Sequence, residues 1–184
     1  MVILSVSRRT DIPAFYLEWF INRIKEGHVL VRNPMNYNMA SKVSLDPKVI
    51  DCIVFWTKDP TNFLKRIDEF SDYNYYFQIT VTPYGRDIEK HIRDKNQIIH
   101  SFRELSKRIG KERVIWRYDP IIITDNMQIE YHKKEFKRLA EEFSGYTDVC
   151  VISFLDMYSK TQRNMREVNP LNITEEKMYA IAGE

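Results

Sequence analysis

Cysteine, glycine and net charge are all scarce in this sequence, and these shortages exclude several classes of protein. The 184 residues include two cysteines, Cys52 and Cys150, five glycines and a formal net charge of +2. Two cysteines cannot form a disulfide framework or a metal site made of cysteine alone, and both lie in apolar runs typical of small buried side chains. The low net charge does not by itself indicate a nucleic-acid-binding protein.

Long apolar runs are also lacking. No run approaches the roughly 20 residues that a membrane helix needs. The short N-terminal run VILSV is followed, not preceded, by arginines, unlike the order in a signal peptide. We therefore expect a cytoplasmic protein with no membrane partner, folded as one domain over residues 1–184.

Short apolar runs alternate with amphipathic stretches along the chain. The expected strands span 2–6, 28–31, 52–56, 75–81, 114–116 and 149–153. Helices are expected over 14–26, 63–70, 98–109, 129–143 and 174–182, and a hairpin-like excursion over 35–46. This alternation is typical of an α/β protein whose parallel sheet is buried on both faces.

Polar residues follow nearly every expected strand, and this decides between two α/β architectures. A doubly wound sheet concentrates function at one switch point, whereas a barrel gathers it from all its strand ends. No glycine-rich phosphate loop follows a strand, which further disfavours the doubly wound fold. The sequence thus predicts a parallel-stranded partial TIM-like (β/α) barrel of about six strands. Because no strand follows the last helix, we expect a C-terminally incomplete barrel: an open one or, as we favour, part of a longer protein.

The stretch RVIWRYDP, residues 113–120, carries the strongest candidates for a functional site. Arg117 and Asp119 follow the apolar part of a strand, and no helix that Asp119 could cap begins directly after Pro120. We predict that the two form a catalytic pair; the alternative is a structural ion pair. The other residues expected to bind a ligand also lie where strands end. They are Ser7, Arg8, Arg9, Asp11, Arg32, Asn33, Lys58, Tyr84, Tyr118 and Ser153.

Simpler explanations compete for some of these residues. Asp11 and Asp59 each precede an expected helix, so capping accounts for both. Tyr84 and Tyr158 are explained equally well by packing. None of the four histidines neighbours another candidate ligand, so no metal site within this chain is expected.

Several long blocks of the sequence resemble a bacterial family catalogued as domain of unknown function 1848 (DUF1848). The blocks are SRRTDIPAF (7–15), RNP (32–34), VSL (43–45), IVFWTKDP (53–60) and VIWRYDPI (114–121). Members of that family are longer, and their C-terminal cysteine cluster is similar to that of radical S-adenosylmethionine enzymes. The resemblance therefore implies a 4Fe-4S cluster and S-adenosylmethionine for the full-length family. This chain lacks the cluster ligands, so we expect it to bind neither cofactor alone.

Three functions remain open from the sequence. The first is the scaffold of a radical-S-adenosylmethionine-like iron–sulfur enzyme whose strand ends bind an anionic carboxylate or phosphate ligand, because arginine forks bond such groups bidentately. The second is a phosphate- or nucleic-acid-binding module without catalysis. The third is an inactive truncated fragment. The oligomeric state is not indicated.

Overall fold

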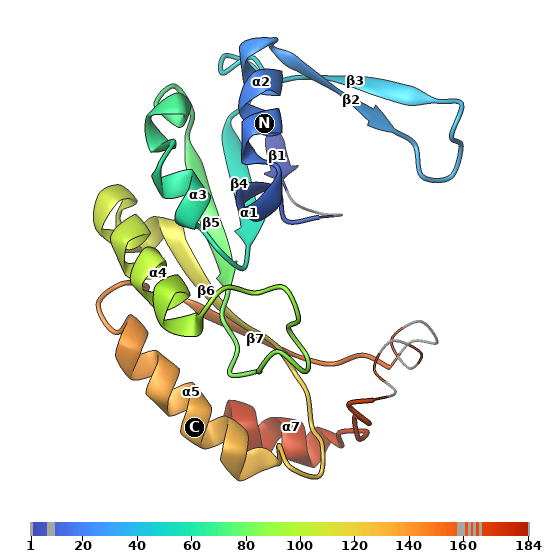
Figure 1. The fold of residues 1–184 in the computed structure, drawn as a ribbon, viewed down its shortest axis with the longest axis vertical. Coiled ribbons are helices and arrows are strands. Elements are labelled where there is room, and N and C mark those ends of the chain that lie inside the picture. The colour runs from blue at the N-terminus through green and yellow to red at the C-terminus, as the bar shows by residue number, and fades with distance from the viewer. Residues whose placement is uncertain are drawn as a thin grey trace. The chain divides into compact units, whose positions relative to one another are not determined.

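The computed structural model describes residues 2–6, 10–157, 161, 163, 165 and 167–183. The chain divides into two compact units, Met1–Gln78 and Ile79–Glu184, which are described separately (Figure 1). A five-stranded parallel sheet has the order β1-β4-β5-β6-β7, and its middle strand β5 (Tyr75–Thr80) contains the division. Among the described residues, no helix is both long and apolar enough to cross a membrane.

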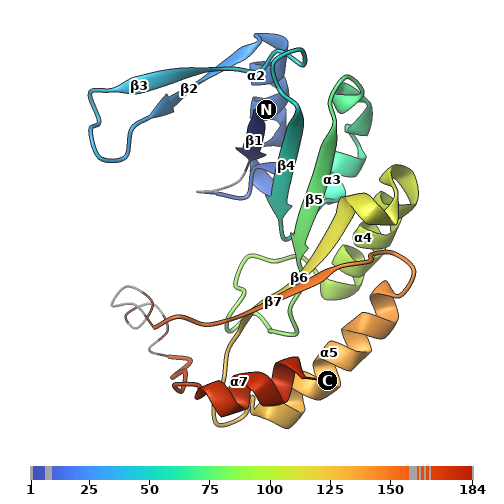
Figure 2. The same ribbon diagram turned by 180° about the vertical axis from the view of Figure 1, so that it is seen from behind.

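The first unit contains three strands of the parallel sheet, a two-stranded hairpin and short helices. Strands β1 and β4 pair in parallel, with Ile3 opposite Cys52 and Val6 opposite Phe55. Helices α2 and α3 lie on one side of these strands, as the two opposite views show (Figures 1 and 2). The elements are β1 (Ile3–Val6), α1 (Ile12–Phe15), α2 (Leu17–Lys25), β2 (His28–Arg32), β3 (Ala40–Ser44), β4 (Cys52–Thr57), α3 (Thr61–Leu64), η1 (Ile67–Phe70) and β5.

Aromatic side chains make the core between these helices and the sheet. Phe55 on β4 is fully buried and lies 5.0 Å, between ring centroids, from both Phe63 and Phe77. Phe63 in turn stacks on Phe70 at 4.6 Å. The strand alternation explains this arrangement, because Phe55 and Phe77 point to the face of the sheet that the helices cover.

The hairpin β2–β3 corrects the expectation that residues 28–31 form a strand of the parallel sheet. His28–Arg32 instead pairs antiparallel with Ala40–Ser44 in a separate two-stranded sheet. The apolar run was identified as a strand correctly, but its partner was not, because β-propensity carries no information on pairing direction. Arg32 and Asn33 therefore do not lie at the end of a parallel strand.

The second unit follows the expected alternation closely. Helices α4 and α5 lie on one side of β6 and β7, as Figures 1 and 2 show from opposite sides. Asp94 caps α4 by accepting hydrogen bonds from the backbone N–H groups of Asn96 and Gln97. The elements are α4 (Lys95–Ile109), η2 (Lys111–Arg113), β6 (Val114–Ile121), α5 (Ile129–Phe143), β7 (Cys150–Phe154) and α7 (Glu175–Ala182).

Strand β6 is longer than the sequence predicts. It continues through Arg117 to Ile121, and Ile121 still pairs with Phe154 of β7 after a register irregularity beyond Tyr118. The strand was expected to end at Trp116, and that bound is too short because β6 and β7 pair again beyond the irregularity. Arg117 and Asp119 consequently lie within the strand.

The α/β class and the parallel sheet are confirmed. About six parallel strands were expected, and the sheet has five because β2 belongs to the hairpin. Thr174 caps α7 as expected, accepting a hydrogen bond from the backbone N–H of Lys177.

Candidate functional site

The two faces of β6 carry different chemistry. Trp116 packs against α5, its ring stacked on Phe136 at 5.0 Å, and Tyr118 lies 5.4 Å from the same ring. Side chains alternate along a strand, so Arg117 and Asp119 point to the opposite face. Parallel pairing places Arg117 beside Val151 of β7 and brings Ser153 next to Asp119. The charged residues thus share the face of unit 2 that α4 and α5 do not cover.

Arg117, Asp119 and Ser153 form one hydrogen-bonded cluster, called here the strand-face cluster. The Arg117 guanidinium donates to Asp119 Oδ2 through Nε, at 2.9 Å, and through Nη2. The Ser153 hydroxyl donates to the other carboxylate oxygen, Oδ1. The Arg117 side chain is 15% exposed and that of Asp119 is 21% exposed. The cluster is therefore a preorganised pair of opposite charges that is only partly exposed to solvent.

Tyr84 supports the backbone directly after Asp119. It lies in the segment between β5 and α4, and its ring is buried. Its hydroxyl donates to the carbonyl oxygen of Pro120 at 2.7 Å and accepts from the Ile122 N–H at 2.8 Å. Burial raises the pKa of Tyr84, so the hydroxyl stays protonated and can keep both roles. Tyr84 was predicted to bind a ligand. It lies close to the cluster, but its hydroxyl is hydrogen-bonded to the backbone of Pro120 and Ile122.

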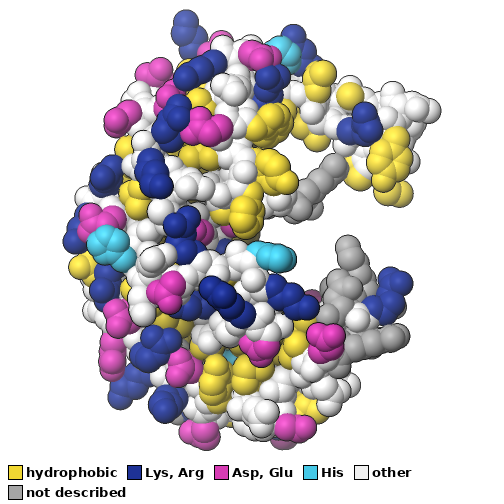
Figure 3. All heavy atoms as spheres, viewed as in Figure 1, with side chains coloured by type: hydrophobic (Ala, Val, Ile, Leu, Met, Phe, Trp, Pro, Cys, Tyr) yellow, Lys and Arg dark blue, Asp and Glu magenta, His cyan; other side chains and the backbone are white. Residues whose placement is uncertain are grey.

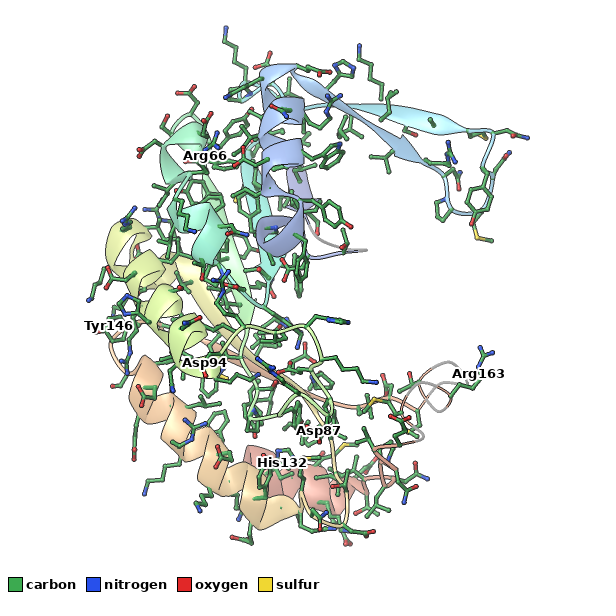
Figure 4. The ribbon with its side chains drawn as sticks, viewed as in Figure 1. Arg66, Asp87, Asp94, His132, Tyr146 and Arg163 are labelled. Carbon is green, nitrogen blue, oxygen red and sulfur yellow. The ribbon has the colours of Figure 1, made fainter. Side chains whose placement is uncertain are left out.

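His132 extends this support from the helix side, and sequence reasoning missed it. The imidazole is fully buried, with Nδ1 2.9 Å from the Tyr118 hydroxyl and Nε2 2.9 Å from the Ile122 carbonyl oxygen. A carbonyl only accepts, so Nε2 carries the proton and Nδ1 accepts from Tyr118. Figure 4 labels His132 on α5. The sequence did contain a signal that His132 is buried. It lies three residues after Ile129 and four before Phe136, and so belongs to the apolar stripe of the helix.

Tyr118 was predicted to bind a ligand, but it lies on the helix-covered face. Its ring is fully buried, and burial raises the pKa of its hydroxyl. The alternation of β6 explains the position, because neighbours of Arg117 must point the other way. Tyr118 therefore packs behind the strand-face cluster.

Asp11 and Lys58 belong to unit 1 and meet each other there. Asp11 caps α1, its Oδ1 accepting from the Ala14 N–H at 3.0 Å, and its Oδ2 accepts from the backbone N–H of Lys58 at 2.7 Å. Asp59 accepts a hydrogen bond from the backbone N–H of Thr61 at the start of α3, although the observed N-cap is the next residue, Pro60.

Four of the residues discussed from the sequence, Ser7, Arg8, Arg9 and Tyr158, lie outside the described residues. That all the predicted residues form one site remains a prediction.

Replacing Asp11 with alanine is expected to destabilise the protein by about 1–3 kcal/mol, because it removes a cap and leaves the Lys58 N–H without its acceptor. Burial raises the pKa of Asp11, so its ionised form is the less favoured one in the folded state. Asp11 should thus contribute less to the stability of the wild type as pH rises through the range just above 4, and the difference in stability between the wild type and Asp11→Ala should narrow. Urea titrations of both proteins between about pH 3.5 and 6 check both points, and a difference that stays constant with pH would contradict the second.

Iron–sulfur ligands are not assembled in this chain. Its two cysteines lie in different units, Cys52 on β4 and Cys150 on β7. Burial raises the pKa of both thiols, that of Cys150 to about 12, which disfavours the thiolate that a metal requires. Within the described ranges, no group of three or more His, Cys, Asp or Glu side chains could hold a metal ion. A 4Fe-4S cluster therefore does not fit the residues present.

The chain is an α/β protein with a parallel sheet. In unit 2, α4 and α5 lie on one face of the strands and the strand-face cluster lies on the other. The sequence matches the family described as Domain of unknown function (DUF1848) over residues 3–184, and the chain belongs to that family. Among the curated proteins and among the solved structures, no match to this chain was found.

Proposed function

We propose that the strand-face cluster binds the anionic group of a small ligand and is the functional centre of a partial (β/α) barrel. The observation that supports this most directly is a preorganised arginine–carboxylate pair, only partly exposed, on the face of β6 and β7 opposite α4 and α5. In parallel α/β folds, ligands bind beyond the carboxyl ends of the strands. Asp119 and Ser153 lie in the second halves of their strands, near that edge.

The charge pattern of the cluster fits a zwitterion better than a simple anion. Arg117 supplies donors for a carboxylate or phosphate, and Asp119 supplies acceptors for an ammonium or a hydroxyl group. An α-amino acid group carries both charges on groups attached to the same carbon atom. S-adenosylmethionine contains such a group in its methionyl part, and when bound it would supply its 5′-deoxyadenosyl group for radical chemistry. In an iron–sulfur enzyme of this kind, cluster ligands would have to come from outside this chain.

Arg117→Ala is expected to weaken binding of S-adenosylmethionine by roughly 10- to 100-fold, because it removes charge-assisted hydrogen bonds to the carboxylate. Arg117→Lys keeps the charge but loses the planar fork, so an intermediate loss is expected. Asp119→Asn should weaken binding of S-adenosylmethionine but leave binding of inorganic phosphate less affected. Isothermal titration calorimetry with both ligands measures these differences.

The matched control is Arg138→Ala, which removes an arginine from an exposed ion pair with Glu135 on α5. It should bind both ligands as the wild type does. If Arg117→Ala and Arg138→Ala bind alike, the strand-face cluster is a structural ion pair and the proposed site is wrong. If the wild type binds phosphate but not S-adenosylmethionine, the anion site stands and the assignment to a zwitterion fails.

A further inference from the structure

The hairpin β2–β3, with its connecting residues 33–39, forms an arm that extends from unit 1 (Figure 1). Large hydrophobic side chains on it are strongly exposed, with Met35 at 92% and Tyr37 at 73%. The connecting loop is nevertheless closed by backbone hydrogen bonds, from the Asn33 N–H to the Met39 carbonyl oxygen at 2.9 Å and from the Met39 N–H to Asn36 at 3.0 Å. An isolated two-stranded hairpin is only marginally stable in water. An arm of this kind is therefore suited to contact a partner.

The strand register places the basic residues of the arm on one face. Leu30 lies opposite Lys42 and Arg32 opposite Ala40, and His28 lies two residues before Leu30 on the same side. Lys42 and Arg32 thus share a face, and the other face carries valines such as Val31. Residues 28–44 include no aspartate or glutamate. Among the described residues, none forms an ion pair with Arg32 or Lys42. This face is positively charged without compensation from its own arm.

The end of the arm alternates amides with large apolar side chains. Residues 33–39 read NPMNYNM, so three asparagines are interleaved with two methionines, a tyrosine and a proline. All but Asn33, which is half-buried, are exposed. Figure 3 shows basic and hydrophobic side chains on the visible face of the arm, and no acidic ones. This end therefore offers both hydrogen-bonding groups and flat or flexible apolar groups.

We propose that the arm is a nucleic-acid-binding element, with Arg32 and Lys42 on phosphates and the 33–39 loop against the bases. Its uncompensated positive face suits a polyanion. Asparagine amides contact base edges and phosphates, a tyrosine stacks on bases, and methionine and proline insert at base steps. An anionic membrane would also attract the cations. The side-chain oxygens of Asn33 and Asn36 accept hydrogen bonds from the Met35 and Asn38 N–H groups, but the NH2 groups of both residues and the Asn38 amide would lose their water in a lipid phase. A second protein chain would complement this positively charged face only if its own contact surface were acidic.

The test measures binding of short random-sequence DNA, as duplex and single strand, by fluorescence anisotropy. Arg32→Gln/Lys42→Gln is expected to weaken binding at least tenfold at low salt. It should also reduce the slope of log K against log salt concentration by about 1.8 for the duplex and about 1.4 for the single strand, for two lost phosphate contacts. Tyr37→Ala is expected to weaken single-strand binding by roughly 5- to 50-fold, with the salt slope unchanged.

The matched control is Lys134→Gln/Lys137→Gln, which removes two exposed cations from α5 and lowers the net charge by the same amount. It should bind as the wild type does. Equal losses in the two double variants would show a diffuse charge effect and overturn the proposal, as would absent or salt-independent binding. Loss of binding to phosphatidylserine vesicles by the arm variants, with DNA binding unchanged, would assign the arm to membranes instead. Because these residues lie outside the strand-face cluster, failure here leaves the proposed ligand site untouched.

Discussion

Phe55→Ala is expected to lower the free energy of unfolding by about 3–5 kcal/mol, a large part of the stability of a domain this size. Phe55 is fully buried, and five aromatic rings lie within 6.0 Å of its ring centroid. Truncation leaves a cavity that these rings cannot close, because they are held by the sheet and by short helices. Urea denaturation of the purified chain measures the effect.

Phe15→Ala serves as the control. Phe15 on α1 is 64% exposed, so its replacement should lower the free energy of unfolding by less than about 1 kcal/mol. Fluorescence of Trp19 and Trp56 reports on unit 1, and that of Trp116 on unit 2. A Phe55→Ala variant as stable as Phe15→Ala would show that the aromatic cluster is not the core of unit 1.

Much of the fold could be predicted from local sequence patterns. Val114 to Trp116 and Cys52 to Trp56 were expected to be strands because continuous apolar runs are typical of a sheet buried on both faces. Both are strands, but α4 and α5 cover only one face of β6, and Arg117 and Asp119 lie on the other. Helix α5 was expected over the residues that form it. Partner choice could not be predicted in the same way, because the run His28 to Val31 looks alike in a parallel sheet and in a hairpin. The partner depends on contacts remote in sequence.

In the candidate site, too, local sequence patterns were predicted correctly and contacts between segments remote in sequence were not. Arg117, Asp119 and Ser153 were predicted as site residues because they lie where apolar strands were expected to end, and the structure brings the three together. The sequence did not show that Tyr118 points to the opposite face from Arg117 and Asp119. The predicted strand ended at Trp116, so the alternation of strand side chains was not applied to Tyr118. His132 was set aside because a lone histidine in a helix shows no ligand pattern. Its partners come from two other segments of the chain.

His132→Ala is expected to lower the free energy of unfolding by about 2–4 kcal/mol at neutral pH. The substitution leaves two buried groups without partners, the Tyr118 hydroxyl and the Ile122 carbonyl. His100→Ala on α4 is the matched control, because His100 is exposed and should change stability little. A His132→Ala variant as stable as this control would show that the hydrogen bonds of His132 contribute little to the fold.

The pH dependence separates hydrogen bonding from simple packing at this position. Burial lowers the pKa of His132 from its ordinary value of 6.5, so the unfolded chain takes up a proton before the folded one does. The wild-type protein should therefore lose stability as pH falls below about 6.5, by up to about 1.4 kcal/mol for each pH unit. His132→Ala cannot show this loss, so the gap between variant and wild type should narrow as pH falls. A gap that stays constant from pH 7 to 5 would mean that the imidazole titrates normally in the folded state, and that Asp119 and its neighbours are not supported by a neutral histidine.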